Sequence, residues 1–228
     1  MASPPVDRTP SAEKGPTASV AMRSVMAGIR HSFPTVQQMS TRSLSDRIRP
    51  EQAEPNMSRP DVVLLDTREL AEYNVSHLPG AKRLDPSISD SDLASFVDDL
   101  RQRQPDAVDK PLDLVCYCSV GYRSSKMASR LQKLLRPPPV ARDQASASAG
   151  QHSSAQTSAK QSSSSPDCAA ATARPVASVF NLEGSMFQWA NENRQLCSAG
   201  TAATRQVHPY SVVWGRLVDR DRHNWGAS

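Results

Sequence analysis

Cysteine and aromatic residues are scarce in this sequence, and their scarcity excludes two kinds of protein. The 228 residues include four cysteines, at positions 116, 118, 168 and 197, and none of them forms a C-x-x-C pair. A disulfide-stapled scaffold and a metal site of paired cysteines are therefore not expected. Aromatic residues make up 5% and apolar residues 38% of the chain, below the roughly 45–50% apolar content of a well-packed globular protein. We therefore expect part of the chain to remain unfolded.

Long apolar runs and a strong charge imbalance are also missing. No apolar run approaches the roughly 18–20 residues of a membrane span, and the first 30 residues lack the apolar block of a secretory signal. The net charge of +4 is too small for a dedicated nucleic-acid binder. We expect no membrane or nucleic-acid partner and a cytoplasmic location. Residues 15–41 hold no acidic residue, which leaves a mitochondrial presequence as the alternative.

The distribution of large apolar residues predicts how the chain is organised. Residues 137–178 contain no Leu, Ile, Phe, Tyr, Trp or Met, so they bury too little apolar surface to offset the entropy of ordering them. We predict a disordered insertion there and a disordered tail over residues 1–27. One domain is expected from residues 28–136 together with 179–195. Residues 196–228 are expected to form an extension packed on it.

Within that domain, short apolar runs alternate with stripes at helical spacing. The runs at 62–65 and 112–118 predict buried strands. Helices are predicted over 90–103, with Ser89 as the N-cap, and from the loop after Cys118 to the prolines at 137. Weaker signals predict an edge strand over 35–39, a helix from Ser40 or Thr41 toward residue 49, and a strand over 179–182 followed by a helical turn. Alternating strands and helices of this kind indicate an α/β fold with a mainly parallel sheet.

The loop after the second predicted strand contains the most informative residues. Cys118 stands at the carboxyl end of the strand, and Arg123 comes just before a helix. Backbone amides of residues 119–123, bent by Gly121, are expected to face the sulfur, and the helix N-terminus adds positive potential. Such a cradle favours the thiolate of Cys118 over the thiol, which makes this residue a candidate nucleophile. The alternative reading is a small buried apolar residue, and Gly121 and Arg123 favour the nucleophile.

Three segments together resemble the rhodanese (sulfurtransferase) family. The loop reads YCSVGYRS over residues 117–124, and the segment LDTRELAEYNVSHLPGA over 65–81 is similar to the family signature D-x-R-x-x-x-E-[FY]-x-x-G-H-[IL]-P-G-A. A third landmark, L-x-G-G followed by Trp, resembles LEGSMFQW over 182–189. Ser76 and Ser185 stand where the family has Gly, and we expect altered turn geometry at both positions.

The resemblance implies a single domain with a central, mainly parallel five-stranded sheet flanked by helices. It also implies that Cys118 takes a sulfane sulfur from a small anionic donor such as thiosulfate and passes it, as a persulfide, to a thiol or cyanide acceptor. Arg123 would attract the donor and hold the loop. The backbone cradle would stabilise the terminal sulfur, and its residues would be Ser119, Val120, Gly121, Tyr122 and Ser124. Neither a metal nor an organic cofactor is implied.

Two other functions remain open on the sequence. Phosphatases related to this fold use C-x5-R loops, whereas Cys118 and Arg123 are separated by four residues, which favours sulfur transfer. A non-catalytic binding or regulatory module is the second alternative, with the insertion over 137–178 recruiting a protein partner or accepting phosphate.

Residues around the motifs are expected to have structural roles. Asp66 should accept hydrogen bonds from nearby loop amides, and Arg68 should pair with Glu72, four positions away. His77 is expected to fix a turn, and Cys116 to be buried and inert. The remaining conspicuous groups, which we expect to be incidental or to pack the C-terminal extension on the domain, are Cys168, Cys197, His208, Tyr210, Trp214 and Trp225.

Overall fold

The computed structural model describes residues 18–48, 61–102, 111–136, 175–198 and 202–226. The predicted insertion lies outside the described residues as far as 174, and so does the predicted N-terminal tail as far as 17. The prediction of a tail over 1–27 is wrong at its carboxyl end, because helix α1 spans Val20–Ser32 and the side chain of Met22 is fully buried. Ser19 caps this helix by accepting a hydrogen bond from the Met22 amide at 3.1 Å.

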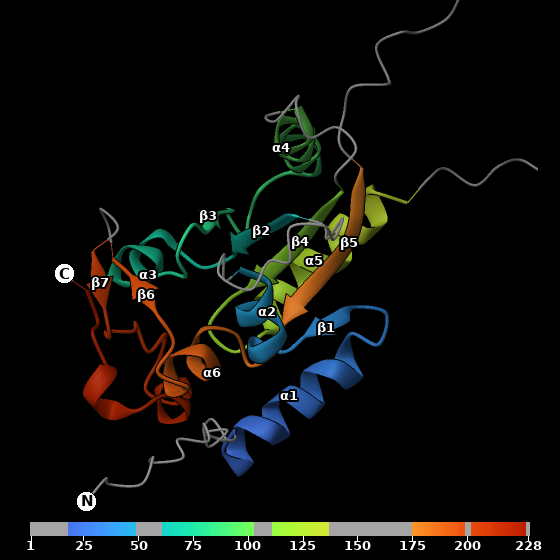
Figure 1. Cartoon of the computed structure of the whole chain (residues 1–228). Helices are drawn as coiled ribbons and strands as arrows, with labels where there is room; N and C mark the ends of the chain where they lie inside the picture. Colours follow the sequence, from blue (N-terminus) through green and yellow to red (C-terminus); the bar gives the residue numbers. More distant parts are fainter. Residues whose placement is uncertain (1–17, 49–60, 103–110, 137–174, 199–201, 227–228) are drawn as a thin grey trace, which may run out of the picture.

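A five-stranded sheet forms the centre of the domain, and its strand order is β1-β5-β4-β2-β3 (Figure 1). Every neighbouring pair is parallel, which confirms the predicted sheet. The strands are β1 (Gln37–Met39), β2 (Asp61–Asp66), β3 (Lys82–Arg83), β4 (Leu112–Tyr117) and β5 (Val176–Leu182). Strand β5 begins three residues before the prediction of 179, since residues 176–178 continue the pairing with β4.

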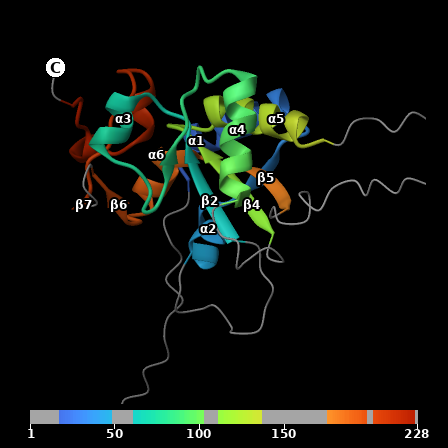
Figure 2. The same ribbon diagram turned by 90° about the horizontal axis from the view of Figure 1, so that it is seen from above.

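Helices cover both faces of the sheet. The other helices of the domain are α2 (Thr41–Ile48), α3 (Leu70–Val75), α4 (Asp90–Gln102), α5 (Tyr122–Leu134) and α6 (Ser185–Asn191). The two predicted caps are confirmed: Ser40 Oγ accepts from the Ser43 amide at 3.0 Å, and Ser89 Oγ accepts from the Asp92 amide at 3.1 Å. Figure 2 shows the sheet between α4 and α5 on one side and α2 on the other.

Two apolar clusters follow from this layering. Successive residues of a strand point to opposite faces, so Leu65 and Leu114 pack with α4 and α5, whereas Leu64 and Val115 pack with α2 and α6. Strand β4 lies between β5 and β2, and all six of its side chains are buried. The loop that follows β4 is therefore anchored by the most buried strand of the sheet.

The C-terminal extension packs on the domain next to α6. It contains β6 (Leu196–Cys197), β7 (Ala203–Thr204) and two short 3₁₀ helices, η4 (Trp214–Leu217) and η5 (Arg220–Arg222). Val207 and Val218 of the extension belong to the same apolar cluster as α6. The backbone of Cys197 also exchanges two hydrogen bonds with that of His77, of 2.7 and 2.9 Å. No helix within the described ranges is long and apolar enough to cross a membrane.

Candidate active site

Cys118 lies directly after β4, and its side chain is 1% exposed. The amide of Gly121 donates a hydrogen bond to Cys118 Sγ at 3.1 Å. Gly121 has φ +117°, a backbone conformation that L side chains rarely adopt, and this turn brings its N–H back toward the sulfur. The Gly121 amide therefore supplies a main-chain donor for charge on the sulfur; a cradle of several amides from residues 119–123 stays a prediction.

Helix α6 holds the loop from the other side. The amides of Met186 and Phe187 donate to the carbonyl oxygens of Cys118 and Ser119, both at 3.0 Å. A trans peptide places a carbonyl and the following N–H on opposite sides of the chain. The N–H groups of Ser119 and Val120 therefore point away from α6.

Ser185 connects the same two segments, although the family has Gly at this position. Its hydroxyl accepts a hydrogen bond from the Cys118 amide at 3.3 Å and donates one to the Leu182 carbonyl at 3.0 Å. Its φ of +50° is in the left-handed region, so the altered turn expected here is realised as a strained serine. The two hydrogen bonds of the Ser185 hydroxyl stabilise this strained backbone conformation.

Arg123 does not present a free charge toward the loop. Its Nη1 donates to Glu72 Oε2 at 2.7 Å, its Nη2 to Glu72 Oε1 at 2.8 Å, and the same Nη2 to Ser119 Oγ at 3.0 Å. Burial alone would lower the pKa of Arg123, but the hydrogen bonds to Glu72 and the charges of Cys118, Glu72 and Tyr210 outweigh it and raise that pKa. Arg123 therefore forms a salt bridge at the edge of the loop, and its partner is Glu72.

The predicted pair of Arg68 with Glu72 is wrong. Arg68 instead bonds Asp66 through Nε at 2.9 Å and Nη2 at 2.6 Å, and both side chains are fully buried. Burial alone would lower the pKa of Arg68, but the charge and hydrogen bonds of Asp66 raise it. Asp66 Oδ1 also accepts from the Arg68 amide at 3.0 Å, which confirms the predicted loop contact. The fork of the Arg68 guanidinium binds both oxygens of Asp66, and Glu72 is bound instead by Arg123.

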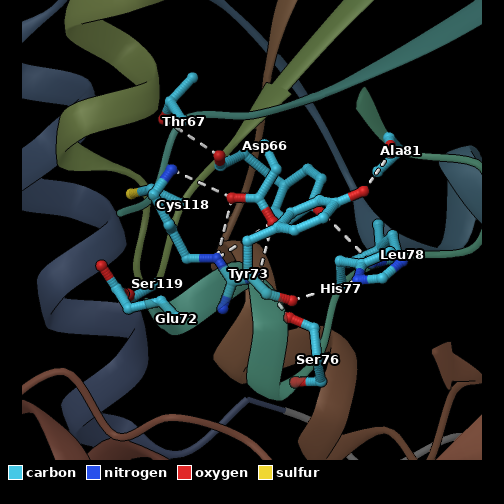
Figure 3. Close-up of polar contacts among 12 residues, drawn as sticks. Asp66, Thr67, Glu72, Tyr73, Ser76, His77, Leu78, Ala81, Cys118 and Ser119 are labelled. Atoms are coloured by element: carbon cyan, nitrogen blue, oxygen red, sulfur yellow. Dashed lines mark hydrogen bonds and ion pairs between the residues drawn. The ribbon is translucent and has the colours of Figure 1, made fainter. Parts of the chain in front are cut away.

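The turn after α3 is fixed by backbone contacts, as expected for His77. Its Nδ1 lies 3.2 Å from the Tyr73 carbonyl oxygen, and the two rings stack at 4.1 Å (Figure 3). Tyr73 Oη donates to the Ala81 carbonyl at 2.9 Å. Ser76 has φ −166°, extended backbone that any residue adopts, so replacing Gly does not alter this turn. Its carbonyl accepts from Arg68 Nη2 at 2.6 Å.

Most of the predicted cradle residues lie together, but one does not. Ser119, Val120, Tyr122 and Arg123 line a cavity with Cys118, and Gly121 contributes its amide. Ser124 instead is fully buried and donates its hydroxyl to Asn181 Oδ1 on β5 at 2.6 Å. The first turn of α5 points the Ser124 side chain toward the sheet; the place of its backbone in the cradle stays a prediction.

The cysteines other than Cys118 are placed differently. Cys116 is fully buried in β4, and burial, followed by the neighbouring Cys118, raises the pKa of its thiol well above the ordinary value. This agrees with the predicted inert role. Cys116, Cys118 and Cys197 are unpaired, and Cys168 lies outside the described residues. In the described ranges, no group of three or more His, Cys, Asp or Glu side chains is placed to hold a metal ion.

Two residues that the sequence did not assign to the site also line the cavity. Tyr210 and Trp214 of the C-terminal extension face the loop, and the Arg123 guanidinium lies 4.6 Å from the centre of the Tyr210 ring. The available signal was a pair of aromatic residues in a chain with few of them, beside a His-Pro step. That signal did not distinguish aromatic residues that only pack the extension on the domain from residues that line the site.

A family model described as Rhodanese-like domain matches residues 49–192. The chain is similar to the solved BH2092 protein of Bacillus halodurans, with 13% identity and a TM-score of 0.45, over 84% of this chain and 96% of that one. It is also similar to a thiosulfate sulfurtransferase of Pseudomonas aeruginosa, with 14% identity and a TM-score of 0.40, over 88% of this chain and 26% of that one.

A third solved structure, from Rhodopseudomonas palustris, is described as a possible tyrosine phosphatase. It is 14% identical, with a TM-score of 0.38, over 83% of this chain and 98% of that one. The comparison with curated proteins gives no match. The family model covers more than half of the chain, including all of β2, β4 and β5 and the loop that carries Cys118. On that match, and with the parallel sheet that accompanies it, the chain belongs to the rhodanese-like domain family.

Proposed function

We propose that the protein is a sulfurtransferase that moves a sulfane sulfur from a donor to a nucleophilic acceptor through a persulfide on Cys118. The observation that carries the proposal is the Gly121 amide, 3.1 Å from Cys118 Sγ, at the carboxyl end of a fully buried strand. A donor N–H at this distance stabilises negative charge on sulfur in the way an oxyanion hole stabilises oxygen.

In the first half-reaction, the Cys118 thiolate attacks the outer sulfur of thiosulfate. A bond forms between Sγ and that sulfur, the bond between the two thiosulfate sulfurs breaks, and sulfite leaves with the electron pair. The persulfide then carries one negative charge on its terminal sulfur. In the second half-reaction, a cyanide or thiolate acceptor attacks the terminal sulfur, and the Cys118 thiolate is the leaving group.

The loop's other residues hold this geometry. Met186 and Phe187 bind the carbonyls of Cys118 and Ser119, while the Arg123–Glu72 pair ties α5 to α3 across the loop. Because Glu72 already neutralises Arg123, we assign Arg123 chiefly to positioning the loop. Its residual field still favours anionic donors at short range.

The test is the mass of the intact protein after incubation with thiosulfate and, separately, with an organic thiosulfonate anion, without reductant. The wild type should gain one sulfur atom and lose it when cyanide is added, with release of thiocyanate. Cys118→Ser should gain none, whereas Cys197→Ser, the matched control, should behave as the wild type. The proposal would be rejected if the wild type gained no sulfur from any donor. It would also be rejected if Cys118→Ser gained a sulfur atom.

A further inference from the structure

The cavity above Cys118 is built from two parts of the chain that are far apart in sequence. Its volume is about 120 Å³. The active-site loop contributes Cys118, Ser119, Val120, Tyr122 and Arg123, and the C-terminal extension contributes Tyr210 and Trp214. The extension therefore forms one wall of the cavity.

The cavity offers little free positive charge. Among the described residues that line it, Arg123 is the only cation, and both of its Nη atoms are bonded to Glu72. The face of the Tyr210 ring covers the guanidinium at 4.6 Å. A dianion such as thiosulfate would lose its hydrating water on entering this cavity and would lie against aromatic rings. Without an unpaired cation to compensate, that desolvation costs binding free energy.

The aromatic wall is held in place by the fold of the extension. The Tyr210 amide donates to His208 Nδ1 at 3.0 Å, and the Trp214 amide donates to Ser211 Oγ at 3.3 Å. Tyr210 has φ +63°, a conformation that costs a non-glycine residue free energy and that persists only where surrounding contacts impose it. Val218, four residues after Trp214, is buried in the domain core.

We propose that Tyr210 and Trp214 are specificity-determining residues that select a sulfur donor whose carrier group is planar and apolar, over inorganic thiosulfate. The inference rests on the proposed sulfur transfer. Aromatic rings attract another ring by stacking or by edge contacts in addition to the burial of apolar area. A cavity of about 120 Å³ is also of the same order as the roughly 150 Å³ apolar cavity that binds benzene in an engineered protein.

Benzenethiosulfonate is a sulfur donor whose carrier group is planar and apolar. The Cys118 thiolate attacks its outer sulfur, a bond forms from Sγ to that sulfur, and the bond to the sulfonyl sulfur breaks. Benzenesulfinate leaves with the electron pair, and the total charge of the reactants is conserved. The phenyl ring of the leaving group would lie against Tyr210 and Trp214 while the transferred sulfur faces the Gly121 amide.

The experiment compares benzenethiosulfonate with methanethiosulfonate, which has the same charge and reacting atoms but no ring. With the full chain and cyanide as acceptor, kcat/KM should be about twofold to tenfold higher for the benzene compound. Tyr210→Ala and Trp214→Leu should each reduce that ratio toward one, whereas Tyr210→Phe, which keeps the ring, should preserve it. Val213→Ala, an exposed change in the same segment, is the matched control and should leave the ratio unchanged.

The outcomes separate this inference from the proposed function. If both donors load Cys118 but the ratio is near one in the wild type, or is unchanged in Tyr210→Ala and Trp214→Leu, the assignment of these rings is overturned and sulfur transfer stands. If no donor loads Cys118, sulfur transfer is rejected.

A binding measurement keeps the assignment testable even without turnover or with a poorly folding variant. Calorimetry on Cys118→Ser should show that benzenesulfinate binds more tightly than methanesulfinate. Equal affinities would overturn the role of Tyr210 and Trp214.

Discussion

Arg123 and Glu72, 51 positions apart in sequence, form a two-pronged ion pair with N–O distances of 2.7 and 2.8 Å. Ser119 joins it by donating its hydroxyl to Glu72 Oε1 at 2.8 Å, and Figure 3 shows Glu72 and Ser119 side by side. The pair connects α3, which follows β2, to α5, which follows β4. The loop that carries Cys118 is therefore clamped by a helix from the neighbouring strand.

Replacement of Glu72 by Gln should weaken both the fold and the loop. The carboxylate is 3% exposed and Arg123 is 22% exposed, so the change leaves a largely buried cation without its countercharge. We expect a loss of about 3 kcal/mol in the free energy of unfolding and slower loading of Cys118. Denaturant titration and thiocyanate production measure the two effects. Asp98→Asn, in an exposed ion pair, is the control and should change neither by much.

The same pair predicts a pH dependence of stability. Burial alone would raise the pKa of Glu72, but the hydrogen bonds and charge of Arg123, with smaller effects of Arg68 and Ser119, outweigh it and lower that pKa. A carboxylate whose pKa is lower in the folded state stabilises the fold above its unfolded pKa, and this stabilisation is lost as the pH falls through the folded pKa.

Denaturation of the wild type and Glu72→Gln between about pH 7 and about pH 3 measures this effect. The difference in unfolding free energy should be largest near neutral pH and should shrink in acid. A difference that stays constant over that range would contradict the argument.

Gly121→Ala should disturb the main-chain donor to Cys118. Position 121 has φ +117°, and a Cβ there would lie 3.3 Å from Asn181 Nδ2. We expect a loss of about 1–3 kcal/mol in stability, and a fall in the rate of persulfide formation because the amide moves from Sγ. Gly28→Ala is the matched control, since a Cβ at position 28 in α1 meets nothing within 4 Å. It should be neutral or stabilising by about 0.4–1 kcal/mol.

Arg68→Lys should be strongly destabilising although the charge is kept. Lysine lacks the fork that binds both oxygens of Asp66 and the Ser76 carbonyl. We expect a loss of about 3–5 kcal/mol, since both members of the pair are fully buried. Arg83→Lys alters the more exposed pair with Asp85 and should cost at most about 1 kcal/mol. Thermal or denaturant unfolding compares the two variants, and equal losses would argue against the role of burial.

Local patterns were sufficient for the two central strands, for the helices that follow them, and for the loop. The apolar runs that became β2 and β4 and the spacing of apolar residues in α4 and α5 report burial within a few positions, and Cys118, Gly121 and Arg123 lie within one short segment. Helix α1 was not predicted, because the residues before 28 resemble a polar tail in composition, although Met22 is fully buried. The hydrogen bond of the Ser124 hydroxyl to Asn181 was not predicted, because sequence adjacency does not give the direction of a side chain on the first turn of a helix.

By itself, the sequence determined the parallel α/β fold, the family and the position of the candidate nucleophile, because these depend on residue periodicity and on motifs a few positions long. Only the tertiary structure decided that Glu72 pairs with Arg123 and Asp66 with Arg68, and that Tyr210 and Trp214 line the cavity over Cys118. Ion pairs and cavity walls depend on distances through space between segments that packing brings together. The local sequence does not encode those distances.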